Sequence, residues 1–248
     1  MMFKNYFKKE FVFCAAIGAG AADPGNWWEY ADKQMRGDRT ESEMVMTIQT
    51  PNWTRTLEIL SQVEGKDKAL STIQSPAKEK GIKTLRLESN MWNYFPKLRR
   101  KIAVSSSMLL ANWMGSDFTN DDILKASSMS KDYNSKFLPD EKLNGESMKV
   151  IENLPKDNSK VMWPRIVTLS SKKDCLPRES RYYDKEGTLK RVLSFGEIKT
   201  FDGHKVPTKW VMQPQDDKTK KTVLEYKDID FQVKYKPNHF SQQNLTRD

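Results

Sequence analysis

The sequence has little of what most catalytic sites are built from. Its 248 residues include 2 cysteines and 2 histidines. His204 follows a glycine in a turn and His239 lies near the C-terminus, and neither has a cysteine or carboxylate at metal-ligand spacing. The sequence also has no glycine-rich phosphate loop and no G-x-S-x-G nucleophile turn. It therefore predicts a protein that is not an enzyme and uses no metal and no cofactor.

Apolar residues are also scarce. They make up 37% of the chain, and the mean hydropathy is -0.76. A sheet buried on both faces would need more of them. A curved antiparallel sheet with one solvent-exposed face fits better, because every second residue of its strands is polar. A chain of 248 residues suits one large β domain.

Only the N-terminus holds an apolar run, "FVFCAAIGAGA", after the basic stretch "MMFKNYFKK". The run is too short to cross a bilayer as a helix and ends in a small-x-small cleavage pattern, although Glu10 precedes it. Residues 1–21 are therefore predicted to be a signal peptide, and residues 22–248 a single domain exported to the periplasm. After cleavage only Cys175 remains, so we expect no internal disulfide bond.

Positive charge exceeds negative charge along the chain. There are 42 lysines and arginines against 33 aspartates and glutamates, a formal net charge of +9. This balance suits anionic partners, although scattered lysines also serve solubility. No nucleic-acid-binding module accompanies the charge, so nucleic acid is not the expected partner. Peripheral contact with a membrane surface is the alternative that we retain.

The pattern of apolar residues predicts one helix followed by many strands. In "NWWEYADKQMRG", Trp27, Trp28, Ala31 and Met35 follow helical spacing and Gly37 ends the helix. Alternating segments such as "EMVMTIQT" and "KVPTKWVMQP" then predict short strands, and "DYNSKFLPDEKLNGES" is interpreted as a polar connection. A sandwich, a barrel or a strongly curved open sheet all fit this order. No internal repeat or linker divides the chain.

One stretch, "NWMGSDFTNDD", combines aromatic residues with carboxylates. Its carboxylates could bind a cation or act in catalysis, but they lack the D-x-D-x-D-G rhythm of a calcium loop. A capped helix explains them better, with Thr119 as the N-cap and Asp122 completing a capping box. The motif loop that both interpretations share contains Gly115, Ser116, Asp117 and Asp121.

The chain is rich in methionine (12) and tryptophan (7), which adapt to irregular apolar partners. Alternation places several of these residues on strand faces, and others flank the motif loop. They form either a pliable core or the wall and lid of a cavity for an apolar ligand. The cavity and lid candidates are Met44, Met46, Trp92, Tyr94, Trp113, Met114, Phe118, Trp210 and Met212.

The succession "SPAKEKG", "LRLESNMWNYFPKLRRKIAVSSSM", "WMGSDFTNDDI", "LPRESRYYDKEGTLKRVLSF" and "VPTKWVM" resembles the outer-membrane lipoprotein-sorting protein family, whose members are similar to periplasmic lipoprotein carriers of the Lol type. The resemblance runs from about Trp28 to "HFSQQNL". It implies a mainly β fold with a few helices, an antiparallel curved half-barrel of about eleven strands lidded by short α-helices. It also implies a cavity that binds a lipid or lipoprotein acyl chain and carries it towards the outer membrane, without catalysis. By the same resemblance, an inner-membrane transporter of the resistance-nodulation-division type is an expected partner.

Two other functions fit the same residues. The domain could be a non-catalytic envelope scaffold or sensor whose interior is filled by its own side chains. It could also be a hydrolase of lipid or envelope polymer that uses Asp117 or Asp121 with His204. The sequence does not identify the lipid.

Overall fold

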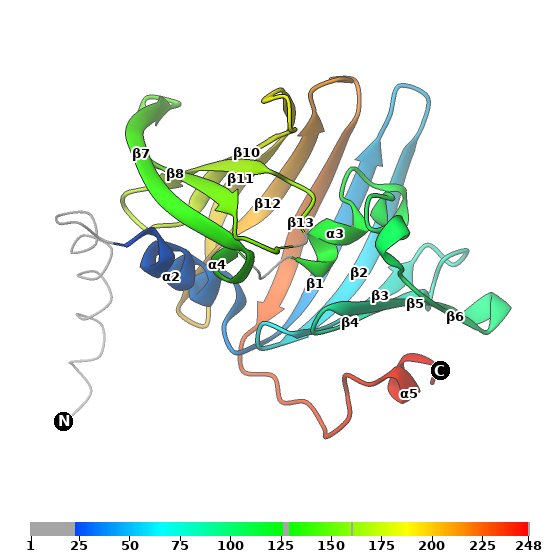
Figure 1. Ribbon diagram of the computed structural model, residues 1–248. Helices are drawn as coiled ribbons and strands as arrows, with labels where there is room; N and C mark the ends of the chain where they lie inside the picture. The colour runs from blue at the N-terminus through cyan, green and yellow to red at the C-terminus, as the bar shows by residue number, and fades with distance from the viewer. Residues whose placement is uncertain (1–22, 126–128, 160, 248) are drawn as a thin grey trace, which may run out of the picture.

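The computed structural model describes residues 23–125, 129–159 and 161–247, and their strands form one curved antiparallel sheet (Figure 1). The 13 strands of this sheet run in the order β6-β5-β4-β3-β2-β1-β13-β12-β11-β10-β9-β8-β7. They are β1 (Arg39–Gln49), β2 (Thr54–Glu64), β3 (Lys68–Ser75), β4 (Lys83–Leu87), β5 (Asn90–Phe95), β6 (Arg100–Ala103), β7 (Tyr133–Leu143), β8 (Glu146–Pro155), β9 (Arg165–Ser171), β10 (Pro177–Tyr183), β11 (Leu189–Phe201), β12 (His204–Pro214) and β13 (Lys221–Asp230).

The sheet consists of two meanders that meet at its centre. Strands β1 to β6 form one meander and β7 to β13 the other, and the β1–β13 ladder joins them. The chain must therefore travel from the edge strand β6 to the opposite edge strand β7. The connection is made by residues 104–132, and the described parts of this crossover segment, residues 104–125 and 129–132, lie on the concave side of the sheet (Figure 1). This segment contains η2 (Ser106–Met108), η3 (Trp113–Gly115), α3 (Asn120–Leu124) and α4 (Met129–Asp132).

The alternation predicted for the first strand is confirmed. In β1, Met44, Met46 and Ile48 are buried, while the residues between them are more exposed. The same face continues in β2 with Leu57 and Ile59. Because neighbouring strands place paired residues on the same face, these side chains form one apolar wall on the concave side.

The predicted N-terminal helix is present as α2 (Pro24–Arg36). Asp23 caps it by accepting a hydrogen bond from the amide of Gly25, and Gly37 ends it with a φ of 59°. Trp28 donates its indole N–H to the side-chain oxygen of Asn153 in β8, at 2.9 Å. The helix therefore covers the concave side of the second meander.

The C-terminal residues cover part of the convex side. Phe240 and Leu245, which lies in α5 (Gln242–Leu245), pack on Leu70, Leu85 and Tyr94 of the first meander. The end of the chain thereby buries apolar side chains that would otherwise face solvent on the outer surface of β3 to β5 (Figure 1).

The fold class is confirmed as a mainly β, curved open sheet with few helices, with two more strands than expected. The connection predicted from residue 132 to residue 147 is instead β7 and the start of β8. The prediction was wrong because β7 is an edge strand, and its exposed positions can be polar without loss of pairing.

The predicted signal peptide, residues 1–21, lies outside the described residues. The expectation of no internal disulfide bond applies to a cleaved chain, and Cys14 also lies outside the described residues. Among the helices that the structure describes, none is both long and apolar enough to cross a membrane.

Candidate functional site

The loop from Asn112 to Thr119 closes on itself. An isolated antiparallel bridge joins Asn112 to Thr119, and the amide of Trp113 donates to the carbonyl oxygen of Phe118 at 2.7 Å. The turn requires a positive φ at two successive residues, 50° at Met114 and 72° at Gly115. Glycine adopts such a φ without strain. The loop therefore holds Trp113 and Phe118 at its two ends, from where they contact the sheet.

Trp113 covers the apolar wall of the first meander. It is 4% exposed and packs in one cluster with Met44, Met46 and Leu57. Its indole N–H donates to the hydroxyl oxygen of Thr84 in β4 at 3.1 Å. Met114 is partly buried against the same cluster. The polar edge of the indole is thus satisfied while its rings remain in apolar surroundings.

Phe118 covers the second meander in the same way. It packs against Leu193 of β11 and Met212 of β12, and Met212 is 1% exposed. Ile123 and Trp210 contact both clusters, so the two halves of the concave face form a continuous apolar layer beneath the crossover segment.

A group of aromatic rings on the same face is only half-buried. Trp210 lies edge-on to Phe195 at 5.1 Å and to Tyr226 at 5.7 Å between ring centroids. Burial of the hydroxyl group raises the pKa of Tyr226 to about 12. The concave face therefore keeps an aromatic surface that the crossover segment does not fully cover.

The crossover segment is attached to the sheet by a buried ion pair that the sequence analysis did not identify. Arg191 of β11 binds both carboxylate oxygens of Asp122, one of them at 2.7 Å. Its guanidinium packs against the rings of both Trp163 and Tyr182, with centroid distances of 4.3 and 4.5 Å. The one signal in the sequence was the position of Arg191, which alternation places on the buried face of its strand together with Leu193.

The capped helix predicted at the motif is confirmed. Thr119 accepts a hydrogen bond from the amide of Asp122, and Asp122 accepts one from the amide of Thr119 at 2.7 Å. Asp122 therefore serves both the helix cap and the ion pair with Arg191.

Two further contacts fasten the motif loop. Asp117 accepts a hydrogen bond from the hydroxyl group of Thr222 at 2.7 Å, and Arg55 donates to the carbonyl oxygen of Met114 at 2.9 Å. Ser116 donates to the carbonyl oxygen of Trp113 at 2.7 Å and so stabilises the turn itself. Thr222 and Arg55 were not among the predicted residues, because their contacts depend on segments far apart in the sequence.

Among the carboxylates of the motif, Asp121 is buried and Asp117 and Asp122 are half-buried. Burial raises the pKa of Asp117 above its ordinary value. Burial, and then the charge of Asp122, raises the pKa of Asp121. Among the residues that the structure describes, no three histidine, cysteine, aspartate or glutamate side chains gather as a metal site would require.

The hydrolase alternative pairs His204 with Asp117 or Asp121, and the structure holds Asp117 far from His204. Asp117 contacts Thr222, which pairs with Met212 near the end of β12, whereas His204 begins the same strand. With a rise of about 3.3 Å per residue, His204 lies roughly 26 Å along the strand from Met212. His204 instead contacts the carbonyl oxygen of Gln34 at 3.2 Å and stacks on the ring of Phe231.

Two of the predicted cavity residues face the other side of the sheet. Trp92 pairs with Leu85, while Thr84, the neighbour of Leu85, faces Trp113. Since side chains alternate along a strand, Trp92 and Tyr94 point to the convex side, where Phe240 and Leu245 lie in the same cluster as Tyr94. Their prediction as concave-side residues was wrong because alternation identifies a shared face but not which face.

The concave face, where a ligand cavity was expected, is covered by side chains of the protein itself. Two pockets near the α2 and α4 end have volumes of about 70 and 170 Å³ and share Lys66 and Ser130. Small-molecule sites usually have volumes of roughly 300–1,000 Å³. Trp113 and Phe118 occupy the apolar wall that the sequence analysis assigned to a ligand.

Comparisons with known proteins agree with the fold. An outer membrane lipoprotein-sorting protein domain from Vibrio parahaemolyticus has 24% sequence identity and a TM-score of 0.80, with 90% of this chain and 98% of that chain covered. A DUF1329 family protein from Desulfovibrio piger has 23% sequence identity and a TM-score of 0.82, with 89% of this chain and 97% of that chain covered. A LolA superfamily protein from Nitrosomonas europaea has 20% sequence identity and a TM-score of 0.77, with 90% of this chain and 100% of that chain covered. No curated protein sequence matches.

A family model with the description "-like: Uncharacterized protein" matches residues 65–247. This range includes the motif loop, Arg191 and Thr222, but not strands β1 and β2 of the first meander. The chain therefore belongs to the family that this model describes, and it has the fold of the outer membrane lipoprotein-sorting and LolA superfamily proteins.

Proposed function

We propose that this protein is a non-catalytic carrier that binds a lipid or lipoprotein acyl chain against the concave face of its sheet. The observation that carries the proposal is the cover of this face. The apolar wall is covered by side chains of one crossover segment, among them Trp113 and Phe118, and not by a second sheet. A segment of this size can withdraw while the strand ladders beneath it stay intact.

The chemistry of the wall suits an acyl chain. Methionine, leucine and isoleucine side chains from the central strands provide adaptable apolar contacts, and the half-buried ring of Trp210 extends them. Each buried methylene group contributes about 0.8 kcal/mol, so a long acyl chain must be enclosed to travel through water. The acyl chain would replace the contacts that Trp113 and Phe118 make in the closed state.

Release of the cover requires a small number of polar contacts to break. Asp122 binds Arg191, Asp117 binds Thr222, Met114 binds Arg55, and Trp113 binds Thr84. All four contacts join the crossover segment to the sheet through side chains. We infer that the structure is the closed state of the carrier and that loading begins when these contacts open.

A reversible covalent lock tests this function. The side chains of Asp117 and Thr222 meet within hydrogen-bond distance, so the double variant Asp117→Cys, Thr222→Cys places two thiols close enough for a disulfide bond. We expect the wild-type protein to bind a dansyl-labelled fatty acid. The oxidised double variant should bind it at least about tenfold more weakly, and reduction should restore binding.

The two single substitutions, Asp117→Cys and Thr222→Cys, are matched controls. Each removes one native hydrogen-bonding group, but neither can form the disulfide bond between positions 117 and 222. They should bind the fatty acid whether oxidised or reduced. If the oxidised double variant binds as well as the reduced one, the crossover segment does not gate the concave face.

A non-catalytic scaffold or sensor is the second candidate. The filled concave face and the small volumes of the two pockets favour it. In that case the wild-type protein would take up no labelled fatty acid under any redox condition. The same titration therefore separates the two functions.

The location and partners of the carrier belong to the same proposal. A periplasmic carrier would receive its acyl chain from the inner membrane, where a transporter of the resistance-nodulation-division type is the candidate donor, and deliver it to the outer membrane. The fold shared with an outer membrane lipoprotein-sorting protein domain supports this assignment.

A further inference from the structure

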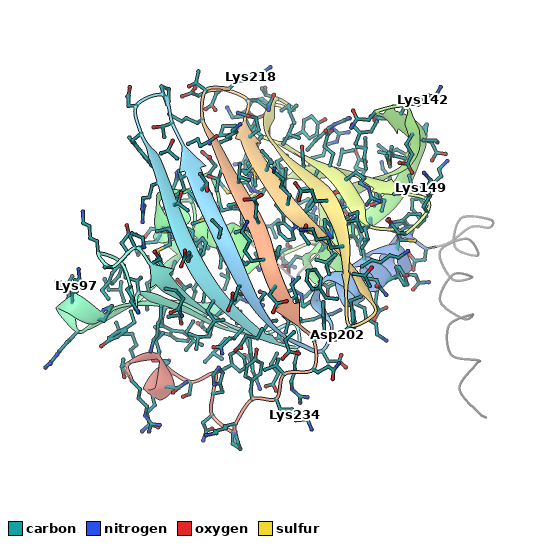
Figure 2. The ribbon with its side chains drawn as sticks, turned by 180° about the vertical axis from the view of Figure 1, so that it is seen from behind. Lys97, Lys142, Lys149, Asp202, Lys218 and Lys234 are labelled. Atoms are coloured by element: carbon teal, nitrogen blue, oxygen red, sulfur yellow. The ribbon has the colours of Figure 1, made fainter. Side chains whose placement is uncertain are left out.

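The β5–β6 hairpin ends in a basic turn with an exposed leucine. Its sequence from Pro96 to Lys101 is "PKLRRK", and the turn forms from η1 (Pro96–Leu98) and a left-handed Arg99. Leu98 is 66% exposed, more than any other large apolar side chain that the structure describes as exposed. Figure 2 shows Lys97 at the far end of this hairpin, projecting away from the body of the sheet.

The cations around Leu98 are not neutralised by the protein. The four side chains are all exposed, and within the described part of the chain none of them makes an ion pair. Lys101 donates only to the side-chain oxygen of Gln242, at 2.7 Å. The four cations are Lys97, Arg99, Arg100 and Lys101.

The hairpin also lies next to a second basic loop. A Cβ atom at Gly81 would lie 3.2 Å from Cγ of Pro96, so the loop that ends at Gly81 packs against the first residue of the hairpin turn. Lys78 and Lys80 in that loop are exposed, and the carboxylate between them, Glu79, is bound by Arg55. The positive charge therefore extends from the hairpin turn to the neighbouring loop.

We propose that this basic hairpin docks the protein on the anionic surface of a lipid bilayer, with Leu98 entering the headgroup layer. Cations near such a surface each favour association, and an apolar side chain between them gains contact with the acyl boundary. The docking role depends on the carrier function for its purpose, but it is carried by the hairpin residues alone.

The shape of the hairpin favours a lipid surface over other anionic partners. Its tip projects outward and presents one apolar side chain at its end, so it can enter a soft layer, whereas a rigid acidic protein would need a complementary pocket. A nucleic acid would bind the cations but would offer no apolar environment for Leu98.

Binding to vesicles tests the proposal with the full-length protein and without cargo. The probes are phosphatidylcholine vesicles with and without phosphatidylglycerol, and bound protein is measured by sedimentation. We expect the wild-type protein to bind only the vesicles that contain phosphatidylglycerol. Replacing the four hairpin cations with glutamine should lower the partition constant by roughly 600-fold, since each cation contributes roughly fivefold.

A matched control separates the hairpin from overall charge. Glutamine at Lys142, Lys185, Lys218 and Lys234, which are exposed elsewhere, removes the same number of charges and should leave binding within about fivefold of the wild type. Leu98→Gln should weaken binding about tenfold with no change in charge. Circular dichroism confirms that each variant is folded.

The proposal is overturned if the wild-type protein does not bind vesicles that contain phosphatidylglycerol. It is also overturned if the control variant loses as much binding as the hairpin variant. Fatty acid uptake by the hairpin variant should equal that of the wild type. Failure of docking and failure of the carrier function therefore give different results.

Discussion

Arg191 and Asp122 form a buried, two-pronged ion pair between β11 and the first turn of α3. Asp122 also caps its own helix through Thr119. One carboxylate thus joins the local structure of the crossover segment to the sheet that the segment covers. The stability of the cover should depend on this pair more than on any exposed contact.

Arg191→Met should lower the free energy of unfolding by about 3–5 kcal/mol, because it leaves the carboxylate of Asp122 without its partner in a buried site. Urea unfolding measures the change. The double variant Arg191→Met, Asp122→Asn should recover part of the loss, since it buries no unpaired charge. Equal losses in the single and double variants would show that the ion pair is not the cause.

Asp117 should make the protein less stable as the pH rises. Burial holds the pKa of Asp117 above its ordinary value, so between the unfolded-state and folded-state pKa values the folded protein binds more protons. In that window, which begins near the ordinary pKa of about 3.9, the free energy of unfolding falls with increasing pH. Asp117→Asn should flatten this dependence and keep the protein at least as stable at neutral pH.

The measurement is the urea midpoint of both proteins across the window. Asp216→Asn, at an exposed carboxylate, is the control and should leave the slope unchanged. A steeper slope in Asp117→Asn than in the wild type would contradict the direction of the pKa shift.

Phe118→Ala should lower the free energy of unfolding by about 3–5 kcal/mol, because Phe118 fills the space against Leu193 and Met212. Leu98→Ala removes an exposed side chain and should change it by less than about 0.5 kcal/mol. Hydrogen exchange should also speed up in the crossover segment before it does so in β1 and β2. Uniform acceleration across the sheet would assign Phe118 to the general core.

Gly115→Ala should destabilise the motif loop for two reasons. The residue has a φ of 72°, and a Cβ atom there would lie 3.3 Å from Nη1 of Arg55. Gly145, at a φ of 81°, has nothing within 4 Å of its Cβ position. Thermal unfolding of Gly115→Ala and Gly145→Ala therefore separates backbone strain, which both share, from the Arg55 contact. Equal shifts in the two variants would show that Arg55 moves aside freely.

Much of the fold could be predicted from local pattern. The spacing of Trp27, Trp28 and Ala31 predicted α2, and the alternation of Met44, Met46 and Ile48 predicted β1. Thr119 and Asp122 predicted the capped turn. Each of these features depends on residues within about ten positions of each other, and the free energies that favour them arise within that distance.

The candidate site was predicted less completely. Trp113 and Phe118 were identified as apolar groups beside a turn, but the sequence did not show that they cover the concave wall. Trp92 and Tyr94 were placed on the wrong side of the sheet because their alternation is identical for either face. The contacts of Asp117 with Thr222 and of Asp122 with Arg191 join residues 105 and 69 positions apart.

The mainly antiparallel β domain with one solvent-exposed face, the N-terminal amphipathic helix and the capped turn at residues 119–124 all follow from the local order of residues. Periodicity and capping are properties of neighbouring residues, so they can be read along the chain. Which face is concave, and that the crossover segment covers it, follow only from contacts between distant parts of the chain. Those outcomes depend on the β1–β13 pairing, which closes the two meanders into one sheet and forces the chain to cross between its edges.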